Sequence, residues 1–459
     1  MKIKKLVVAL AAVGFTTGAY ATNGMNLEGY GPIAAGMGGA SFAYDNGTAA
    51  VMNNPATLSL AGNGSRLDLA LGYLGPKVAV EGGQKSDGTA YFMPAMGWVK
   101  KSGDLSYGAA MFAQGGMGTE YAMGLDGKKD RSELGVGRMI FPLSYSLTKD
   151  FAVGASADFV WAMMDIKMAM PASSMLGMMT PGSGTGAFGL FNTVSTLNDL
   201  ASALGISLDP LMSGRVDASD DSDYTGKAKT FGYAGKLGFT FKLSDKLTLG
   251  GTYHSKTRLK DMKTSRKGAQ MVITAAGIDM PTDGKLIIHD FQWPETYGLG
   301  LALKATDHLM FAFDVKRIGW KSVMKNFSMT FTTSDALGSG QPGSVDFVMP
   351  QNWDDQTVYS LGGSYKLSDA LTLRAGVNMA NNPIPDATMN YLFPAIVKNH
   401  LALGLGYAFS PESEMNLSVQ YAPKVTQTNP DPNGDGDSAD AYTVSHSQTS
   451  AQLMYSARF

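Results

Sequence analysis

The chain has 459 residues, 44% of them apolar, so it is long enough to bury a large core. A net charge of -2 gives no reason to expect nucleic acid as a partner. The absence of cysteine excludes disulfides, thiolate metal sites and a cysteine nucleophile.

Residues 1–21 are predicted to form a cleaved signal peptide. MKIKK is a basic start, LVVALAAVGF an apolar stretch, and Ala19-Tyr20-Ala21 a cleavage site of the A-x-A type. The apolar stretch is too short to cross a bilayer, and no later segment offers a long uncharged apolar run. An exported chain of this kind is expected to be either a soluble protein or a β-barrel.

The next segment, 22–62, is rich in glycine and alanine and only weakly periodic. A flexible tail is one interpretation, but Met25, Leu27, Tyr30 and Phe42 would not favour free solution. We therefore expect this segment to form a compact plug, or hatch, that enters the lumen of a barrel from the periplasmic side.

Residues 63–459 show the period-two pattern of long strands. In FGYAGKLGFTFKL the odd positions from Phe231 to Leu243 are mostly apolar and the even ones are small or polar, and LALGLGYAF and LTLRAGVN repeat the pattern. A soluble β-sandwich would alternate as well. These runs, however, exceed the typical strand length of about 5–6 residues, and their apolar rows often end in aromatic residues, as in membrane barrels.

The connections between these runs are of two kinds. Long irregular segments alternate with tight polar turns, namely KKSGDLSYG, YSLTKDFAVG, FKLSDKLTLG, LKATDHLMFA, YKLSDALTLR and AFSPESEMNLS. This asymmetry is typical of outer-membrane barrels. Six turns join twelve strands, and a first strand near 65–80 and a last near 445–459 raise the expected number to fourteen. The predicted fold is an all-β, fourteen-stranded antiparallel transmembrane barrel with the hatch in its lumen.

The last strand, AQLMYSARF, has two faces. Leu453, Tyr455 and Phe459 are expected to face lipid, and Gln452, Ser456 and Arg458 the lumen. A terminal aromatic such as Phe459 resembles the signal read by the barrel-assembly machinery. We expect a monomer in the bacterial outer membrane, in contact with its lipid and lipopolysaccharide.

The hatch segment resembles a known family. GMGGASFAYDNGTAAVMNNPATL is similar to the hatch of the FadL family of outer-membrane long-chain fatty acid and hydrocarbon transporters, whose Asn-Pro-Ala motif is here Asn54, Pro55 and Ala56. FQWPETYGLG and NNPIPDATMN extend the resemblance, and only the long loops diverge. The resemblance implies capture in an extracellular apolar groove, transfer to an internal site and hatch-gated lateral release into the bilayer. No cofactor is implied, and no enzyme activity.

The longest loop, about 169–228, supplies the predicted groove. Its methionines are soft and adaptable, and an apolar stripe at helical spacing runs on from Leu190. A helix that packs on other loops as a lid remains the alternative. The groove candidates are Met175, Met178, Met179, Phe188, Leu190, Phe191, Val194 and Leu197.

A fatty-acid carboxylate would need a basic partner. The candidates are Lys167, Lys316, Arg317 and Arg374, although each could instead be solvated or paired with a carboxylate. The strand that begins NWDDQ departs from the fatty-acid members of the family, since Asp354 stands where they carry a lysine. Trp161 or Met163 stands near another of the family's basic positions. These departures favour neutral hydrocarbons.

The loop DPNGDGDSADAY carries a weak calcium candidate. Asp431, Asn433, Asp435 and Asp437 have the spacing of a calcium loop, but Tyr442 replaces the expected glutamate. The predicted function is energy-independent uptake of long-chain fatty acids or similar hydrophobic compounds. Neutral or aromatic hydrocarbon uptake by the same architecture is one alternative, and a surface adhesin, phage receptor or general porin is another.

Overall fold

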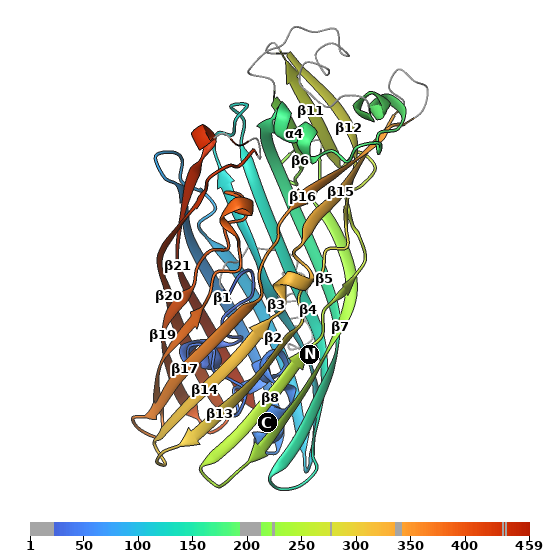
Figure 1. The fold of residues 1–459 in the computed structure, drawn as a ribbon. Helices are drawn as coiled ribbons and strands as arrows, with labels where there is room; N and C mark the ends of the chain where they lie inside the picture. Colours follow the sequence, from blue (N-terminus) through green and yellow to red (C-terminus); the bar gives the residue numbers. More distant parts are fainter. Residues whose placement is uncertain are drawn as a thin grey trace.

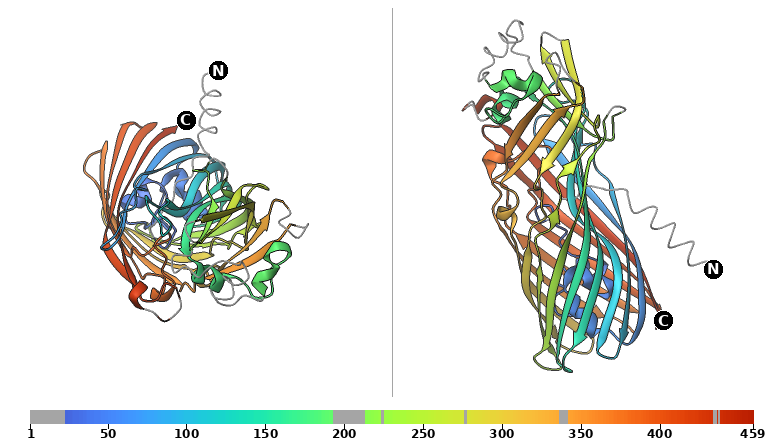
Figure 2. Two further views of the ribbon diagram at one scale, coloured as in Figure 1. Left: turned by 90° about the horizontal axis from the view of Figure 1, so that it is seen from above. Right: turned by 90° about the vertical axis from the view of Figure 1, so that its right-hand side faces the viewer.

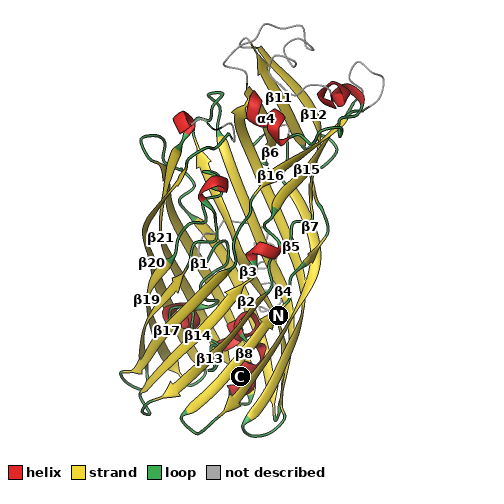
Figure 3. Cartoon of the chain, in the orientation of Figure 1, coloured by secondary structure: helices red, strands yellow, loops and turns green. Residues whose placement is uncertain are grey.

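The computed structural model describes residues 23–192, 213–222, 225–275, 278–335, 342–433, 436 and 438–459. The predicted signal peptide lies outside the described residues. The described chain is dominated by one antiparallel sheet that curls into a tall barrel (Figures 1 and 3).

A ring of long strands forms the barrel wall. Each strand pairs with the next in an antiparallel sense, and the last pairs with the first, with Arg66 opposite Arg458. Within the described residues, every wall strand is therefore paired on both sides over at least part of its length, so the ring closes. Its strands are β1 (Gly64–Val80), β2 (Tyr91–Ser102), β3 (Leu105–Tyr121), β4 (Asp130–Ser146), β5 (Phe151–Pro171), β7 (Ala228–Lys242), β8 (Leu247–His254), β13 (Thr296–Lys304), β14 (Leu309–Ile318), β17 (Gln356–Lys366), β18 (Leu371–Ala380), β19 (Asn399–Ser410), β20 (Ser413–Asn429) and β21 (Tyr442–Arg458).

Further strands, most of them short, extend the sheet beyond the ring on the side of the long loops. They are β6 (Ser213–Ala218), β9 (Arg258–Leu259), β10 (Met262–Lys263), β11 (Ala269–Ala275), β12 (Ile278–His289), β15 (Asn326–Thr333) and β16 (Ser344–Pro350). From β5 the pairing runs through β6, β11, β12 and β15 to β16, and this extension stands above the barrel mouth in Figure 1.

The predicted fold was wrong in its strand number. Among the described residues, the sheet that forms the ring and its extension contains 21 strands, not fourteen. The prediction counted tight polar turns and added the first and last strands, so it missed every other strand that is not joined to its neighbour by such a turn. The other strands arise in segments rich in glycine and proline, where Met271 lies opposite Val216 and Val272 opposite Pro281. These pairs form between segments that are distant in sequence or interrupted by proline, so alternation alone does not reveal them.

The outer face of the wall carries the apolar rows that the alternation predicted. Leu237, Leu401 and Leu403 are exposed. His400 and Ala402, the two neighbours of Leu401 in β19, are buried on the inner face. In the last strand, Tyr455 is exposed and Ser456 is buried, and Phe459, which follows the strand, is exposed. Such a belt of exposed leucine and aromatic side chains suits a lipid environment. None of the helices among the described residues is long and apolar enough to cross a membrane.

The N-terminal segment, residues 23–62, lies inside the barrel, as the view from above shows (Figure 2, left). It contains α2 (Pro32–Gly36), η1 (Gly47–Ala49), α3 (Ala50–Asn53) and η2 (Pro55–Leu60). Every residue from 23 to 59 is buried except Asp45. Helix α2 contacts β18 to β21, while η2 contacts β4, β5 and β7, so the segment touches both sides of the wall.

Two wall glycines allow this close approach. A Cβ atom on Gly250 would lie 1.8 Å from the carbonyl oxygen of Phe42, and one on Gly238 would lie 2.0 Å from Oδ1 of Asn54. The remaining helices lie between strands, and the first two of those given below, α4 and η3, hold part of the predicted groove. They are α4 (Ala172–Met178), η3 (Gly186–Asn192), η4 (Trp320–Ser322), η5 (Asp386–Thr388) and η6 (Ser438–Asp440).

Candidate functional site

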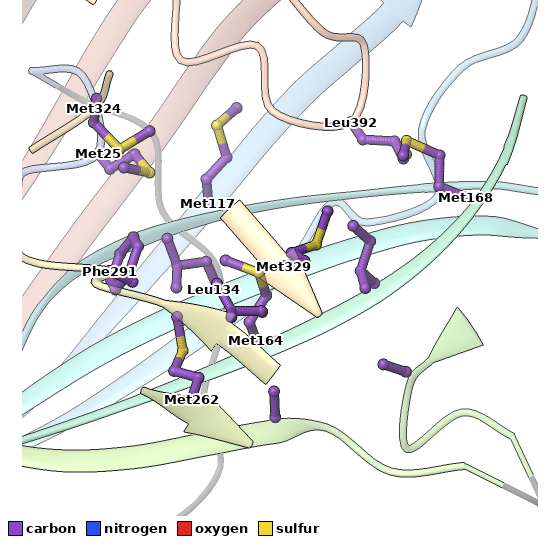
Figure 4. Packing of buried hydrophobic residues seen from close by; sticks show 14 of the residues in the cluster. Met25, Met117, Leu134, Met164, Met168, Met262, Phe291, Met324, Met329 and Leu392 are labelled. Carbon is purple, nitrogen blue, oxygen red and sulfur yellow. The ribbon is translucent and has the colours of Figure 1, made fainter. Parts of the chain in front are cut away.

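A large apolar cluster fills the barrel above the N-terminal segment. It draws side chains from that segment, from the wall strands and from the long connections, and methionine is its most conspicuous residue type (Figure 4). Met25 of the N-terminal segment, Met117 of β3 and Met164 of β5 are all nearly inaccessible to solvent. Because methionine is flexible and polarizable, a cluster of this kind can adapt to apolar ligands of different shapes.

Three tryptophans form a row within this cluster. The rings of Trp293 and Trp320 have centroids 5.5 Å apart, and those of Trp320 and Trp353 lie 5.2 Å apart, both in edge-to-face orientation. Nε1 of Trp293 donates to Asn26 Oδ1 at 3.2 Å, and Nε1 of Trp320 donates to Gln356 Oε1 at 3.4 Å. Nε1 of Trp353 is buried and has no hydrogen-bond partner within the described part of the chain.

The predicted site did not include these tryptophans. The only signal in the sequence was their place in the blocks FQWPET, IGW and NWDD, which stand far apart along the chain. Barrel closure and the inward course of the connections bring the three indoles together.

The connection between β18 and β19, residues 381–398, forms an inner loop that reaches across the lumen to β3 and β4. The carbonyl oxygen of Leu392 accepts hydrogen bonds from Oγ1 of Thr119 at 3.1 Å and from Oγ of Ser132. The hydroxyl of Tyr391 donates to Oδ2 of Asp130 at 2.6 Å. The inner loop thereby becomes part of the apolar cluster, to which it contributes Leu392.

The described groove candidates join the same cluster. Met175, Met179 and Phe188 are buried in it, Met178 packs against it half-buried, and the rings of Phe188 and Phe331 lie 6.1 Å apart. The apolar cluster is thus continuous from the long loop to the N-terminal segment. Leu190 and Phe191 lie in η3, but their side chains are outside the described residues, as are Val194 and Leu197.

Three of the four head-group candidates are engaged by other groups. Nζ of Lys167 lies 3.6 Å from Oδ2 of Asp217. Nη2 of Arg317 lies 3.2 Å from Oδ2 of Asp355, on the outer face of the wall, where Arg317 lines an apolar groove of about 510 Å³. Nη1 of Arg374 donates to Asn416 at 3.0 Å, next to the N-terminal segment.

Lys316 differs from the other three. It follows the inward-facing Asp314 by two positions in β14, so it points to the lumen, and it forms no ion pair within 4.0 Å in the described residues. The four basic side chains therefore do not form one head-group site.

The motif Asn54-Pro55-Ala56 ties the N-terminal segment to the wall. Nδ2 of Asn54 donates to the carbonyl oxygen of Phe42 at 2.7 Å and to that of Phe239 in β7 at 3.0 Å. Its Oδ1 accepts from the backbone N–H of Ala56 at 3.1 Å, which caps η2. Pro55 occupies the first position of this helix, where its missing N–H is not needed.

The wall is interrupted next to the N-terminal segment. The ladder between β2 and β3 ends at the pair Met96 and Met111, although β3 continues to Tyr121. A bulge at Gln114 follows, and the backbone N–H of Gly116 donates to the carbonyl oxygen of Met25 at 3.0 Å. A cavity of about 30 Å³ lies here, lined by Leu27, Tyr30, Gly31, Ala70, Gly72, Met93, Ala95, Phe112, Ala113 and Gln452.

The calcium candidates are only partly described. The backbone N–H of Gly436 donates to Oδ2 of Asp431 at 3.0 Å, and Oδ1 of Asn433 accepts from Ser174 at 2.7 Å. Asp435 and Asp437 lie outside the described residues. Within the described residues, no group of three or more histidine, aspartate or glutamate side chains could hold a metal ion.

Comparisons with known proteins place the chain in a family. Residues 8–459 match the family model described as "Outer membrane protein transport protein (OMPP1/FadL/TodX)". The structure of the P. putida toluene transporter TodX is 30% identical, with 95% of this chain and 99% of that chain covered and a TM-score of 0.78. The Ralstonia pickettii toluene transporter TbuX is 27% identical over 95% of this chain and 99% of that one, with a TM-score of 0.73.

Two further matches are more limited. A Pseudomonas aeruginosa FadL homologue, 16% identical over 95% of this chain and all of its own, has a TM-score of 0.70 and shares the fold. An uncharacterized Chlorobium limicola protein is 46% identical over 86 residues, which are 18% of this chain and 42% of that protein. The predicted family is confirmed: this chain belongs to the OMPP1/FadL/TodX family of outer-membrane transport proteins.

Proposed function

We propose that this protein carries small, mainly apolar molecules across the outer membrane by diffusion, with monoaromatic hydrocarbons as the first candidates. The observation that carries the proposal is the continuous apolar cluster, which runs from Phe188 at the long loop to Met25 in the N-terminal segment and includes three indoles in edge-to-face contact. The similarity to toluene transporters over 95% of the chain supports it.

The physical chemistry of the cluster suits such ligands. Burial of apolar surface contributes about 0.8 kcal/mol per CH₂ group. Edge-to-face contacts with an aromatic ring contribute about 0.5–1.5 kcal/mol beyond burial. A monoaromatic ligand between Trp320, Trp353 and the methionines would gain both, and the concentration gradient alone would drive its movement.

Release would occur sideways, with the N-terminal segment acting as a hatch. The interruption between β2 and β3 supports this route, because no ladder hydrogen bonds need to break there. Withdrawal of Met25 from Gly116 and of Tyr30 from Gln114 would join the apolar cluster to the small cavity at the interruption. From that cavity, Phe112 and Met93 would lead to the bilayer.

A second candidate is the uptake of long-chain fatty acids. It is favoured by Lys316, which faces the lumen without an ion pair within 4.0 Å among the described side chains. A carboxylate at this position would form a charge-assisted hydrogen bond.

Equilibrium dialysis of radiolabelled toluene against the purified full-length protein tests the first candidate. We expect binding that excess benzene displaces, and an affinity about fivefold lower in Trp353→Ala, consistent with one lost aromatic contact. Trp98→Ala is the matched control, because Trp98 packs on Tyr107 on the outer face. Oleate that displaces toluene in the wild type but not in Lys316→Met would support the second candidate. Absence of toluene binding, or equal effects of both tryptophan variants, would refute the assignment.

A further inference from the structure

A row of polar side chains lines one side of the lumen. We call it the polar column; it consists of His400 of β19, Ser418 and Gln420 of β20, and His446 and Gln448 of β21. All five are at most 1% exposed. They face inward, because their neighbours in the strands, such as Leu401, Val419 and Tyr421, are exposed on the outer face.

The polar column is largely without hydrogen-bond partners. Among the described residues, no partner is found for either ring nitrogen of His400, for either amide atom of Gln420, or for Oγ of Ser418. Nε2 of His446 and Oε1 of Gln448 are unpartnered as well, although the other polar atom of each side chain is bonded.

Single buried polar atoms elsewhere in the lumen also lack partners among the described residues, as Nη2 of Arg138 and Oδ1 of Asp314 do, but the polar column groups several of them in one row. Other buried positions are bonded. On the opposite side, His254 of β8 is also buried, and its Nε2 lies 3.1 Å from the carbonyl oxygen of Asn53. Ser144 of β4 is bonded to Ser59 at 2.6 Å. Buried polar groups without partners are costly and rare in folded proteins. A row of them on one wall indicates a partner that comes from outside the chain.

The position of the polar column connects it to the apolar cluster. At one end, Ser418 lies opposite Gly404, which contacts Gly36 of the N-terminal segment. At the other end, Nδ1 of His446 lies 2.9 Å from the carbonyl oxygen of Pro394 in the inner loop. Ala422 and Val444, on the same strands, belong to the apolar cluster. A ligand with its apolar body in the cluster could therefore place a polar end on the column.

The chemistry of the column defines that polar end. Imidazole, amide and hydroxyl groups supply both donors and acceptors, and the column contains no lysine, arginine or carboxylate. We propose that the polar column binds a neutral hydrogen-bonding group, such as a hydroxyl, on an otherwise apolar ligand, so that phenols and similar compounds are substrates. This inference rests on the proposed function and extends its substrate class.

The test compares two probes that differ by one hydroxyl, toluene and p-cresol. Their equilibrium binding to the purified full-length protein is measured for the wild type, Gln420→Leu and His400→Leu. We expect p-cresol affinity to fall about tenfold in each variant, as for the loss of one buried hydrogen bond, with toluene affinity changed less than twofold. Heat-modifiable gel migration verifies that each variant is folded.

Ser456→Ala is the matched control. Ser456 lies on the same wall, but its Oγ accepts from Nη2 of Arg66 at 3.0 Å, so we expect the ratio of p-cresol to toluene affinity to stay unchanged. If both column variants bind p-cresol like the wild type, the column holds only water and the inference is wrong. Equal loss of both probes would also overturn it. If the wild type binds p-cresol but not toluene, and Gln420→Leu loses p-cresol affinity, the polar column is supported and the proposed hydrocarbon uptake is refuted.

Discussion

Replacing Asn54 by alanine should loosen the N-terminal segment without unfolding the barrel. The side chain is fully buried and makes three hydrogen bonds, to Phe42, Phe239 and Ala56. The bonds to Phe42 and Ala56 lie within the segment, so only the bond to Phe239 of β7 opposes its release. A typical net contribution is about 1 kcal/mol per bond. This cost falls on the local equilibrium between the seated and the released segment, since the strand ladders contain none of these bonds. The released population should therefore rise about fivefold.

Hydrogen–deuterium exchange followed by mass spectrometry measures this effect. Peptides that cover η2 should exchange about fivefold faster in Asn54→Ala, whereas peptides from β7 should exchange at the wild-type rate. Asn46→Ala is the control, because Nδ2 of Asn46 bonds only to Ser41 and Tyr44 within the segment itself. Unchanged exchange in η2, or faster exchange in β7 as well, would refute the view that this motif specifically ties the segment to the wall.

Three other substitutions test separate parts of the account. Ala113→Phe should fill the cavity of about 30 Å³ at the β2–β3 interruption. Toluene uptake by cells should then slow more than tenfold while equilibrium binding of toluene stays unchanged, and unchanged uptake would argue against lateral exit at this interruption. Tyr391→Phe removes the hydrogen bond to Asp130, which is worth about 1.5–3 kcal/mol for a charged acceptor. Amide exchange in the inner loop should therefore rise at least tenfold, and an unaltered exchange rate would contradict the anchoring role of Tyr391. Lys316→Met should leave toluene affinity within twofold of the wild type by dialysis, and a large loss would show that the lysine shapes the apolar site.

The wall of the barrel was the most predictable part of the fold. Alternation requires only that one face meets lipid, and Leu237 and Leu403 lie on that face as expected. The short strands were not predictable in this way. Strand β12 contains Pro281, and β11 and β12 depend on pairing with β6 and β15, which only the folded chain brings near.

The candidate site was predictable in part. The abundance of methionine in the long loop pointed to Met175 and Met179, which are buried in the apolar cluster. Adjacent residues of a strand face opposite sides, so Lys316 and Arg317 could not share one site, and Arg317 is on the outer face. The indole row could not be predicted, because its members follow no common period.

The same limit applies to the polar column. Period-two alternation gives the direction of Gln420 and Gln448 but not their hydrogen-bond partners. Whether a buried amide is satisfied depends on which segment packs against it, and that segment can come from any part of the chain. The inner loop and the N-terminal segment, which cover this wall, are irregular and carry no periodic signal.

The most direct test of the central claim is a crystal structure of the protein soaked with bromobenzene, with the bromine located by its anomalous scattering. The account predicts a bromine peak inside the barrel, within van der Waals distance of Trp320, Trp353 and Met117. Anomalous peaks only on the outer face of the wall, or only among the surface loops, would contradict the claim that the apolar cluster is the site of passage.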